Sequence, residues 1–337
     1  ERVGVRRPKS KDITAMAVYT EVSDEELVEF MTAYDLGEVV AFKGIAEGIE
    51  NSNFLLTMSS GAYILTLYEK RVDPRDLPFF VALLDHLAAG GVACPLPVRA
   101  RDGEALRTLC GRPAAIVTFL PGLWPRRVTP DHCAGIGRAL AQMHLAGADF
   151  PGGRENALSV GAWRPLLKSA GDGIDTVQVG LGDKLNRDLD AIEVAWPRDL
   201  PRGIIHADLF PDNVFFRGTE LTGLIDFYFA CRDFLVYDLA ICLNAWCFEA
   251  DYSFNVTKAR RLVMEYARTR PLGADEVQAL PLLARGAAMR FLVTRLYDWL
   301  NTPPGALVTP KDPLEYVAKL RFHERVASGA EYGLDVD

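Results

Sequence analysis

The dipeptide Pro121-Gly122 divides the sequence into two parts that follow different patterns. Before it, short apolar runs bounded by glycine, proline and polar residues are typical of β-strands. After it, apolar residues recur mostly at the spacing of amphipathic helices. We therefore predict an α+β, bilobal protein in which an N-terminal antiparallel five-stranded sheet lobe precedes a mainly helical C-terminal lobe.

The individual elements are predicted from the same patterns. A first helix is expected to begin at Ser23, where an N-cap is followed by three acidic residues that suit the first turn of a helix. Strands are expected at residues 39–42, 53–58, 63–68, about 96–100 and 114–119, with a helix at 77–89. Later helices are expected at 130–144, 183–196, 237–247, 257–269, 274–297 and 314–327. Residues 148–180, rich in Gly, Pro and polar residues, are expected to form an irregular insertion with short helices.

Composition restricts the class of partner. With 337 residues, 49% of them hydrophobic, the chain can bury a full core. Its net charge of −8 disfavours nucleic acid or a membrane surface, because both attract basic faces. No apolar run approaches the roughly 20 residues of a membrane span, and six cysteines without a C-x-x-C pair indicate reduced thiols. We expect a cytoplasmic protein that acts on a small molecule.

The segment 203–240 carries polar residues in the order that phosphoryl transfer requires. His206-Ala-Asp208 is followed by Asn213 and then by an apolar run that ends at Asp226. One carboxylate must orient or deprotonate the attacking hydroxyl, while an amide oxygen and a second carboxylate hold magnesium against the phosphates. An isolated His-x-Asp is often only a capped turn, but four polar positions in the required order favour catalysis.

These residues resemble the catalytic segment of the aminoglycoside phosphotransferase and choline kinase superfamily, which reads H-x-D-x-x-x-x-N before a later Asp. More closely, GIENSNFLL, YILTLYE, HADLFPDNVFF and LIDFYFACRDFLVYDLAI resemble the bacterial homoserine kinases of this superfamily, which feed threonine synthesis. The resemblance covers the chain from about Met16. It implies a protein-kinase-like fold, with ATP as co-substrate and Mg²⁺ as cofactor. It makes Asp208 catalytic and Asn213 and Asp226 metal ligands, and it gives His206 and Asp238 the role of supporting the catalytic loop.

The resemblance also gives each part of the chain a function. Residues 16–120 are expected to form the nucleotide-binding lobe, and residues 121–337 the catalytic and substrate-binding lobe. Residues 1–15 are basic and polar, so we interpret them as a disordered or upstream extension. An Arg-rich targeting peptide is the alternative, which the acidic residues of this segment disfavour.

A glycine turn lies between two of the predicted strands. On its own, Gly44-x-x-x-Gly48 could be an ordinary hairpin turn. Ahead of a kinase-like catalytic segment, it is expected to cover the phosphates with the backbone N–H groups of residues 47–52. The strand that ends near Phe119 is expected to enter a hinge whose backbone groups bind adenine. The predicted nucleotide-binding residues are Gly44, Gly48, Asn51, Ser52, Thr66, Thr118, Phe119 and Leu120.

Thr66 departs from the kinase pattern. Kinases usually place a Lys on the third strand to bind phosphates, whereas a Thr hydroxyl donates one hydrogen bond and brings no charge. Either Lys43, Lys70 or Arg71 compensates, or magnesium and the glycine turn carry more of the phosphate binding. A nucleotide-binding pseudokinase is a third alternative, disfavoured by the intact catalytic and metal-binding residues.

The fold alone does not choose the substrate, because choline, aminoglycoside, methylthioribose and fructosamine kinases have similar folds. Homoserine is predicted from the resemblance. As a zwitterion it needs a cation for its carboxylate, whereas choline and aminoglycosides need an acidic or aromatic pocket. The candidate substrate-binding residues are Arg232, Asp233 and Arg295, with Arg290, Glu249 and Asp298 as further charged candidates.

Overall fold

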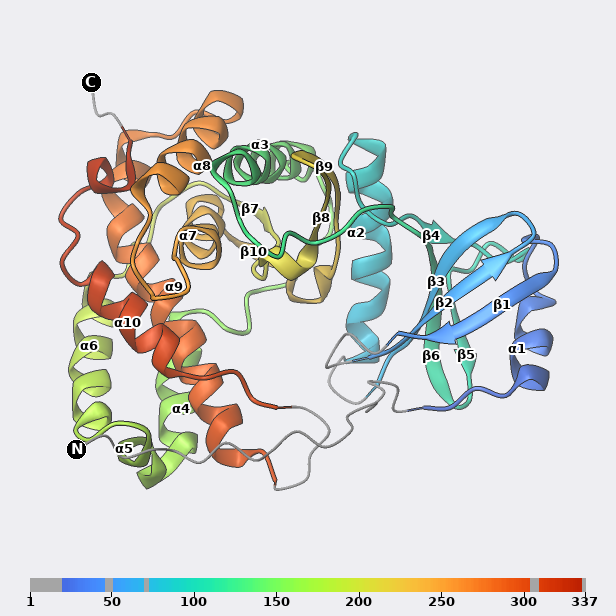
Figure 1. Cartoon of the computed structure of the whole chain (residues 1–337), viewed down its shortest axis with the longest axis horizontal. Coiled ribbons are helices and arrows are strands. Elements are labelled where there is room, and N and C mark those ends of the chain that lie inside the picture. Colours follow the sequence, from blue (N-terminus) through green and yellow to red (C-terminus); the bar gives the residue numbers. More distant parts are fainter. Residues whose placement is uncertain (1–19, 46–50, 70–72, 304–308, 335–337) are drawn as a thin grey trace. The chain divides into compact units, whose positions relative to one another are not determined.

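A computed structural model describes residues 20–45, 51–69, 73–303 and 309–334. The chain forms two compact units (Figure 1). The first runs up to Pro74 and includes Val98–Val117, and the second contains Arg75–Pro97 and the chain from Thr118 onward. The first is built on a sheet and the second mainly on helices, which confirms the predicted α+β class.

The first unit begins with helix α1 (Asp24–Met31). Ser23 and Glu26 form a capping box, in which Ser23 Oγ accepts a hydrogen bond from the Glu26 N–H at 3.2 Å. Glu26 Oε2 in turn accepts one from the Ser23 N–H at 3.0 Å. The apolar face of the helix, with Leu27, Phe30 and Met31, packs into the core that lies on the sheet.

The sheet of this unit contains β1 (Val39–Gly44), β2 (Ser52–Met58), β3 (Gly61–Leu67), β4 (Pro97–Val98), β5 (Leu106–Leu109) and β6 (Arg112–Thr118). The strand order is β1-β2-β3-β6-β4, and β5 pairs with β6. The pairs β1–β2, β2–β3 and β5–β6 are antiparallel. Buried and half-buried side chains alternate along β2, as expected for a strand with one face on a core.

The sheet has six strands where the sequence predicts five. The additional strand, β5, is only four residues long and includes the charged Arg107. The turn to β6 contains Cys110 and Gly111, both with positive φ, at 49° and 70°. A Cys-Gly pair lacks the usual Asn-Gly or Asp-Gly signal of a hairpin turn, and the four residues before it are too few to show a strand pattern.

The second unit contains helices α2 (Leu77–Ala89), α3 (Pro130–Ala146), α4 (Val160–Ala170), α5 (Ile174–Val177), α6 (Leu181–Ala195), α7 (Leu235–Trp246), α8 (Val256–Thr269), α9 (Ala274–Asn301) and α10 (Leu314–His323). It also has two antiparallel strand pairs: β7 (Arg202–Ile205) with β10 (Cys231–Phe234), and β8 (Val214–Arg217) with β9 (Glu220–Leu224). The predicted insertion at residues 148–180 contains α4, which packs against α9.

Helix α2 belongs to the second unit, although the predicted lobe boundary at residue 120 assigns it to the first lobe. Leu83 and Leu87 are part of the core of the second unit. Phe79 packs edge-on against Phe150, with ring centroids 5.7 Å apart. The compact units therefore differ from the predicted lobes in the segment Arg75–Pro97 and at residues 118–120.

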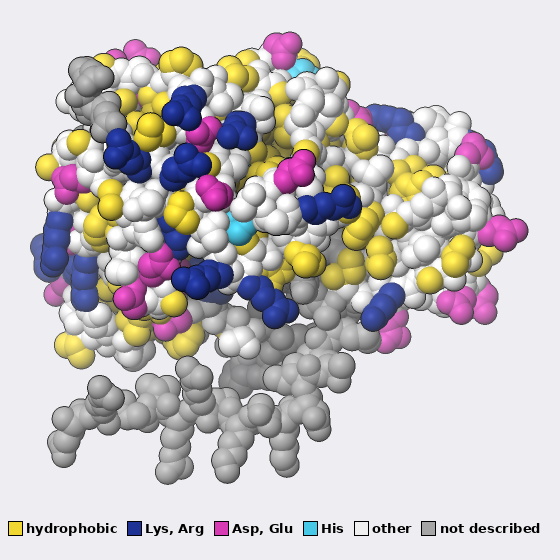
Figure 2. Space-filling model, turned by 45° about the horizontal axis from the view of Figure 1, so that its top comes forward, with side chains coloured by type: hydrophobic (Ala, Val, Ile, Leu, Met, Phe, Trp, Pro, Cys, Tyr) yellow, Lys and Arg dark blue, Asp and Glu magenta, His cyan; other side chains and the backbone are white. Residues whose placement is uncertain are grey.

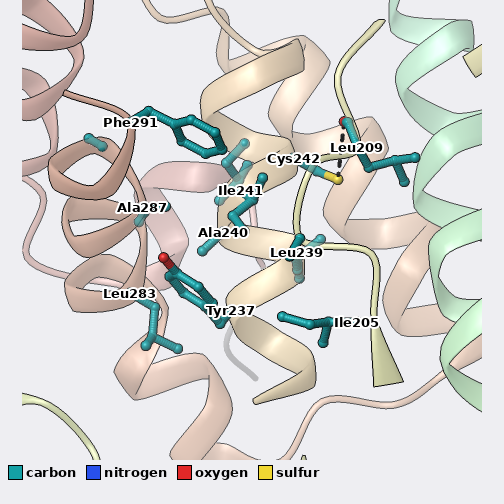
Figure 3. Close-up of a cluster of buried hydrophobic side chains, with 14 of the residues drawn as sticks. Ile205, Leu209, Tyr237, Leu239, Ala240, Ile241, Cys242, Leu283, Ala287 and Phe291 are labelled. Atoms are coloured by element: carbon teal, nitrogen blue, oxygen red, sulfur yellow. Dashed lines mark hydrogen bonds between the residues drawn. The ribbon is translucent and has the colours of Figure 1, made fainter. Parts of the chain in front are cut away.

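Helix α7 lies at the centre of the second unit, and eleven of its twelve residues are buried. Figure 3 shows Tyr237 of α7 directed toward Leu283 and Ala287 of α9, and Phe291 of α9 directed toward α7. This dense packing on all sides holds the first turn of α7, including Asp238, in a fixed position.

The surface charge is mixed. On the face drawn in Figure 2, Lys and Arg side chains alternate with Asp and Glu side chains. Among the described residues, no helix is both long and apolar enough to cross a membrane.

Candidate active site

The predicted catalytic loop follows β7, and Asp238 binds its first two N–H groups. The His206 N–H donates to Asp238 Oδ2 at 2.7 Å, and the Ala207 N–H donates to Asp238 Oδ1 at 2.9 Å. Ala207 has a φ of 63°, a conformation that costs free energy for a residue with a side chain. The two charge-assisted hydrogen bonds stabilise this turn, which leads directly into Asp208.

A buried chain of side chains supports Asp238 from behind. His144 Nε2 lies 3.2 Å from Asp238 Oδ2, and His144 Nδ1 lies 2.7 Å from the Tyr266 hydroxyl. Arg270 Nη1 donates to the Tyr266 oxygen at 3.2 Å and to Glu276 Oε1 at 2.9 Å. One arrangement of protons satisfies every group, because Nε2–H donates to the carboxylate while Nδ1 accepts from the phenol.

The charge states of this chain follow from burial and hydrogen bonding. Burial alone would raise the pKa of Asp238, but the hydrogen bond from His144 and the loop donors hold it below its usual value. Burial lowers the pKa of His144 in spite of the neighbouring carboxylate, and it also lowers the pKa of His206. Asp238 is therefore ionised, and His144 is a neutral donor to it.

A third buried histidine predicts acid sensitivity of the second unit. Burial, followed by the nearby Lys319, lowers the pKa of His323 to about 3, and its ring contacts the Tyr332 hydroxyl and Asn244 Oδ1. The folded pKa lies below the unfolded value, so the stabilisation is complete above about pH 6.5 and declines as the pH falls toward 3. We expect the free energy of unfolding to drop by about 2 kcal/mol between pH 7.5 and 5 from this group alone.

Tryptophan fluorescence can measure this loss, because all five tryptophans lie in the second unit. Urea unfolding at several pH values gives the slope of stability against pH. His323→Phe should be less stable at every pH but should have a shallower slope below pH 6.5, since one protonation is removed. A slope parallel to that of the unchanged protein would contradict the assignment.

The His206 ring is engaged within the loop itself. Nε2 donates to the Ile225 carbonyl at 2.9 Å, and Nδ1 accepts from the Asp208 N–H at 3.3 Å. Asn213 Nδ2 donates to the Asp208 carbonyl at 2.8 Å and to Asp208 Oδ2 at 3.3 Å. The loop thus orients Asp208 through its backbone and one carboxylate oxygen.

The β8–β9 hairpin brings the backbone next to Asp226 against Asn213, although the two residues are separated in the sequence. The Ile225 N–H donates to the Asn213 carbonyl at 3.0 Å, and Asp226 follows with φ 64° and ψ 61°. Because the Asn213 amide nitrogen donates to Asp208, its oxygen points elsewhere. An amide oxygen and a carboxylate are hard donors of the kind magnesium prefers, so these side chains fit that ion. The described residues contain no cluster of three or more His, Cys, Asp or Glu that suits a metal.

Two donors hold the loop carbonyls on either side of Asp208. Arg290 Nη1 of α9 donates to the Ala207 carbonyl at 2.5 Å, and Trp246 Nε1 of α7 donates to the Leu209 carbonyl at 2.7 Å. The sequence predicts Arg290 only as a further charged candidate for substrate binding, not as a donor to the loop. It does not predict the contact of Trp246 with the loop. These partners lie 83 and 37 residues from the loop, and no spacing rule connects them to it.

Two of the predicted phosphate-binding residues of the first unit, Asn51 and Ser52, are hydrogen-bonded to Glu69. Ser52 Oγ donates to Glu69 Oε1 at 2.8 Å, and Asn51 Oδ1 accepts from the Glu69 N–H at 3.3 Å. Gly44 is the last residue of β1. Gly48 lies outside the described residues.

Thr66 also uses its hydroxyl inside the sheet. It is buried on β3 and donates to Asn53 Oδ1 at 2.8 Å on the paired strand β2. Of the cations predicted to compensate for it, Lys43 is exposed on β1, whereas Lys70 and Arg71 lie outside the described residues.

In the predicted hinge, Thr118 is hydrogen-bonded to Leu96, which lies in the segment that leads into β4. The Thr118 N–H donates to the Leu96 carbonyl at 2.9 Å, and its Oγ1 accepts from the Leu96 N–H at 2.9 Å. Phe119 is exposed and Leu120 is half-buried. The Thr118 N–H is therefore already used. The N–H groups of this segment that remain as predicted adenine donors are those of Phe119 and Leu120.

The three candidate substrate-binding residues lie in separate environments. Arg232 Nη2 on β10 lies 3.5 Å from two backbone carbonyls, and Asp233 accepts from Asn156 Nδ2 at 2.8 Å. Arg295 on α9 is paired with Glu315 Oε2 at 2.6 Å. Arg232 and Asp233 are adjacent on β10, and among the described residues neither is paired with Arg295.

Solved structures with the same fold are phosphotransferases. A spectinomycin phosphotransferase in complex with ADP and spectinomycin superimposes with a TM-score of 0.65 at 14% identity, covering 93% of this chain and 98% of that one. A choline kinase from Cryptosporidium parvum gives a TM-score of 0.65 at 13% identity, covering 90% and 95%. At this identity the likeness concerns the fold, and it confirms the predicted protein-kinase-like class.

Sequence comparison identifies the family. The pattern of the APH phosphotransferase enzyme family matches residues 41–272, and the chain belongs to this family. Curated homoserine kinases are close relatives. The protein of Rhodospirillum rubrum is 63% identical over 95% of this chain and 99% of its own length, and that of Afipia carboxidovorans is 64% identical over 95% and 98%. The chain is thus an ATP-dependent kinase that acts on a hydroxyl group.

Proposed function

We propose that the chain transfers the γ-phosphoryl group of ATP to the side-chain hydroxyl of L-homoserine, giving ADP and O-phospho-L-homoserine for threonine biosynthesis. The observation that carries this proposal is the identity of more than 60% with curated homoserine kinases over 95% of the chain. The substrates of the structural neighbours, which are below 25% identical, do not bear on the choice. The predicted cytoplasmic location stays a prediction.

Asp208 is the proposed catalytic base. Its carboxylate accepts the proton of the homoserine hydroxyl while the hydroxyl oxygen bonds to the γ-phosphorus and the bond from that phosphorus to the β–γ bridging oxygen breaks. The fixed turn at Ala207 and the bond from Asn213 hold this carboxylate in one orientation, which reduces the entropy lost in reaching the transition state.

Asn213 and Asp226 are the proposed holders of magnesium. The ion would neutralise charge on the triphosphate. In the first unit, the backbone around Gly44 and Ser52 is proposed to bind the phosphates. Either Lys43, Lys70 or Arg71 takes the place of the usual strand lysine, or magnesium and this backbone carry more of the phosphate binding. Thr66 brings no charge to that role.

A substrate panel tests the proposed function. ADP release should be measured with homoserine, serine, choline and kanamycin, with the Asp208→Asn variant as a control for ATP hydrolysis in the absence of transfer. Homoserine should exceed serine by at least about 10²-fold in kcat/KM, because the serine hydroxyl is one methylene closer to the anchored charges and falls short of the in-line position. Efficient turnover of choline or kanamycin with homoserine untouched would overturn the proposal. ATP binding without transfer to any alcohol would favour the pseudokinase alternative.

A further inference from the structure

Arg290 is a buried cation without a described counter-ion. Its side chain is 2% exposed at the centre of α9. A guanidinium has five N–H donors. The Ala207 carbonyl accepts from Arg290 Nη1, and the Tyr237 hydroxyl also lies beside the guanidinium, which opposes the rise in the pKa of that phenol caused by burial. Arg290 Nε is buried without a hydrogen-bond partner. A buried, unpaired charge costs several kcal/mol, so a native position of this kind suggests that an anion arrives from outside.

The surroundings of Arg290 increase the local positive charge. Arg295 and Lys319 share a single carboxylate, Glu315, at 2.6 Å each. Among the described residues of this neighbourhood, three cations (Arg290, Arg295 and Lys319) therefore outnumber two carboxylates, Glu315 and Asp208. Arg290 itself lies against the rings of Phe291 and Phe229, at 4.6 and 5.8 Å from their centroids, where water competes weakly for a ligand.

The Tyr316 hydroxyl is a second buried donor in this neighbourhood without a described partner. Its ring packs against Phe291, with centroids 5.3 Å apart. Burial, the largest cause, raises the pKa of this phenol. Arg295 and Arg290 act electrostatically to lower that pKa, and Glu315 and Asp208 act to raise it. The hydroxyl therefore lies within electrostatic range of both the proposed base and the unpaired guanidinium.

We propose that Arg290, assisted by the Tyr316 hydroxyl, binds the α-carboxylate of the amino-acid substrate beside Asp208. This inference rests on the proposed function. Arg290 takes the place of the predicted candidates Arg232 and Arg295. Arg295 already has a carboxylate partner in Glu315, and Arg232 Nη2 lies against the carbonyls of Phe150 and Gly152. A carboxylate bound at Arg290 lies close to the residue that precedes Asp208, since the same guanidinium holds the Ala207 carbonyl.

The experiment compares homoserine with 3-aminopropanol, which is the same molecule without its carboxylate. In the unchanged protein, homoserine should be preferred by about 10²-fold or more in kcat/KM, the worth of one or two charge-assisted hydrogen bonds. In Arg290→Met this preference should fall to within about threefold, and the KM for homoserine should rise far more than that for ATP. Tyr316→Phe should reduce the preference by about fivefold.

Arg285→Met is the matched control, because Arg285 lies on the same helix and pairs with Asp188 at 3.1 Å. It should keep the preference of the unchanged protein. If Arg290→Met does not fold, Arg290→Lys makes the same test, since it keeps a charge but loses the planar fork and should retain only part of the preference.

Two results would count against the inference, and they can be told apart. If Arg290→Met or Arg290→Lys lowers kcat/KM for homoserine and for 3-aminopropanol by the same factor, Arg290 only supports the loop and the inference is wrong. If the unchanged protein does not phosphorylate homoserine at all, the proposed function fails first.

Discussion

Asp208→Asn is expected to lower kcat for homoserine phosphorylation by at least about 10²-fold and to leave the KM for ATP within about threefold. An amide cannot accept the hydroxyl proton, but its oxygen can still accept the hydrogen bond from Asn213 Nδ2 that orients the carboxylate now. The loop should therefore keep its geometry while the chemical step slows. Steady-state kinetics of ADP release measure both parameters.

The stability of this variant is the control. Its unfolding midpoint should match that of the unchanged protein, because the contacts of Asp238 with the loop do not involve the Asp208 side chain. Near-normal turnover in a folded Asp208→Asn protein would remove Asp208 from the mechanism.

Asp226→Ala should have the larger effect, with turnover reduced at least about 10³-fold. The variant removes one of two proposed protein ligands of magnesium, so ATP affinity should no longer rise when Mg²⁺ is added. Calorimetric titration of ATP at increasing Mg²⁺ concentrations measures this coupling directly, without reference to catalysis.

Asp212→Ala is a matched control for that experiment. Asp212 lies beside Asn213 in the same loop, but its side chain is 54% exposed and forms an ion pair with Lys311 at 3.7 Å. This variant should keep both turnover and the magnesium dependence of ATP binding within about threefold. Unchanged magnesium dependence in Asp226→Ala would contradict the assignment of Asp226 as a ligand.

The sequence predicts most of the fold because its local signals agree with one another. Ser23 carries the cap that begins α1, and the apolar run that predicts a helix at 77–89 coincides with α2. The strand β5 could not be predicted, since its four residues acquire their conformation from pairing with β6 and not from their own pattern. The assignment of α2 to the second unit depends likewise on contacts with Phe150, far along the chain.

For the candidate site, the order of residues along the chain is informative and their partners are not. Asp208, Asn213 and Asp226 are recognisable because a loop and a hairpin separate them by characteristic spacings. His144 and Trp246 support the same loop from helices whose apolar patterns predict only a core. Such residues become visible only when the packing of α3 and α7 is known, because nothing in the local sequence distinguishes them from ordinary core positions.

The contact between Arg290 and the Ala207 carbonyl has a consequence for redesign and for evolutionary change of substrate. In many enzymes a specificity residue can be exchanged without disturbing the reacting groups. Here one guanidinium would both bind the carboxylate of the substrate and hold the Ala207 carbonyl, which precedes the base Asp208. A descendant that accepts an uncharged alcohol would have to lose this arginine and, at the same step, acquire another donor for that carbonyl. Changes of substrate in this chain should therefore require paired substitutions, with single ones passing through a slow intermediate.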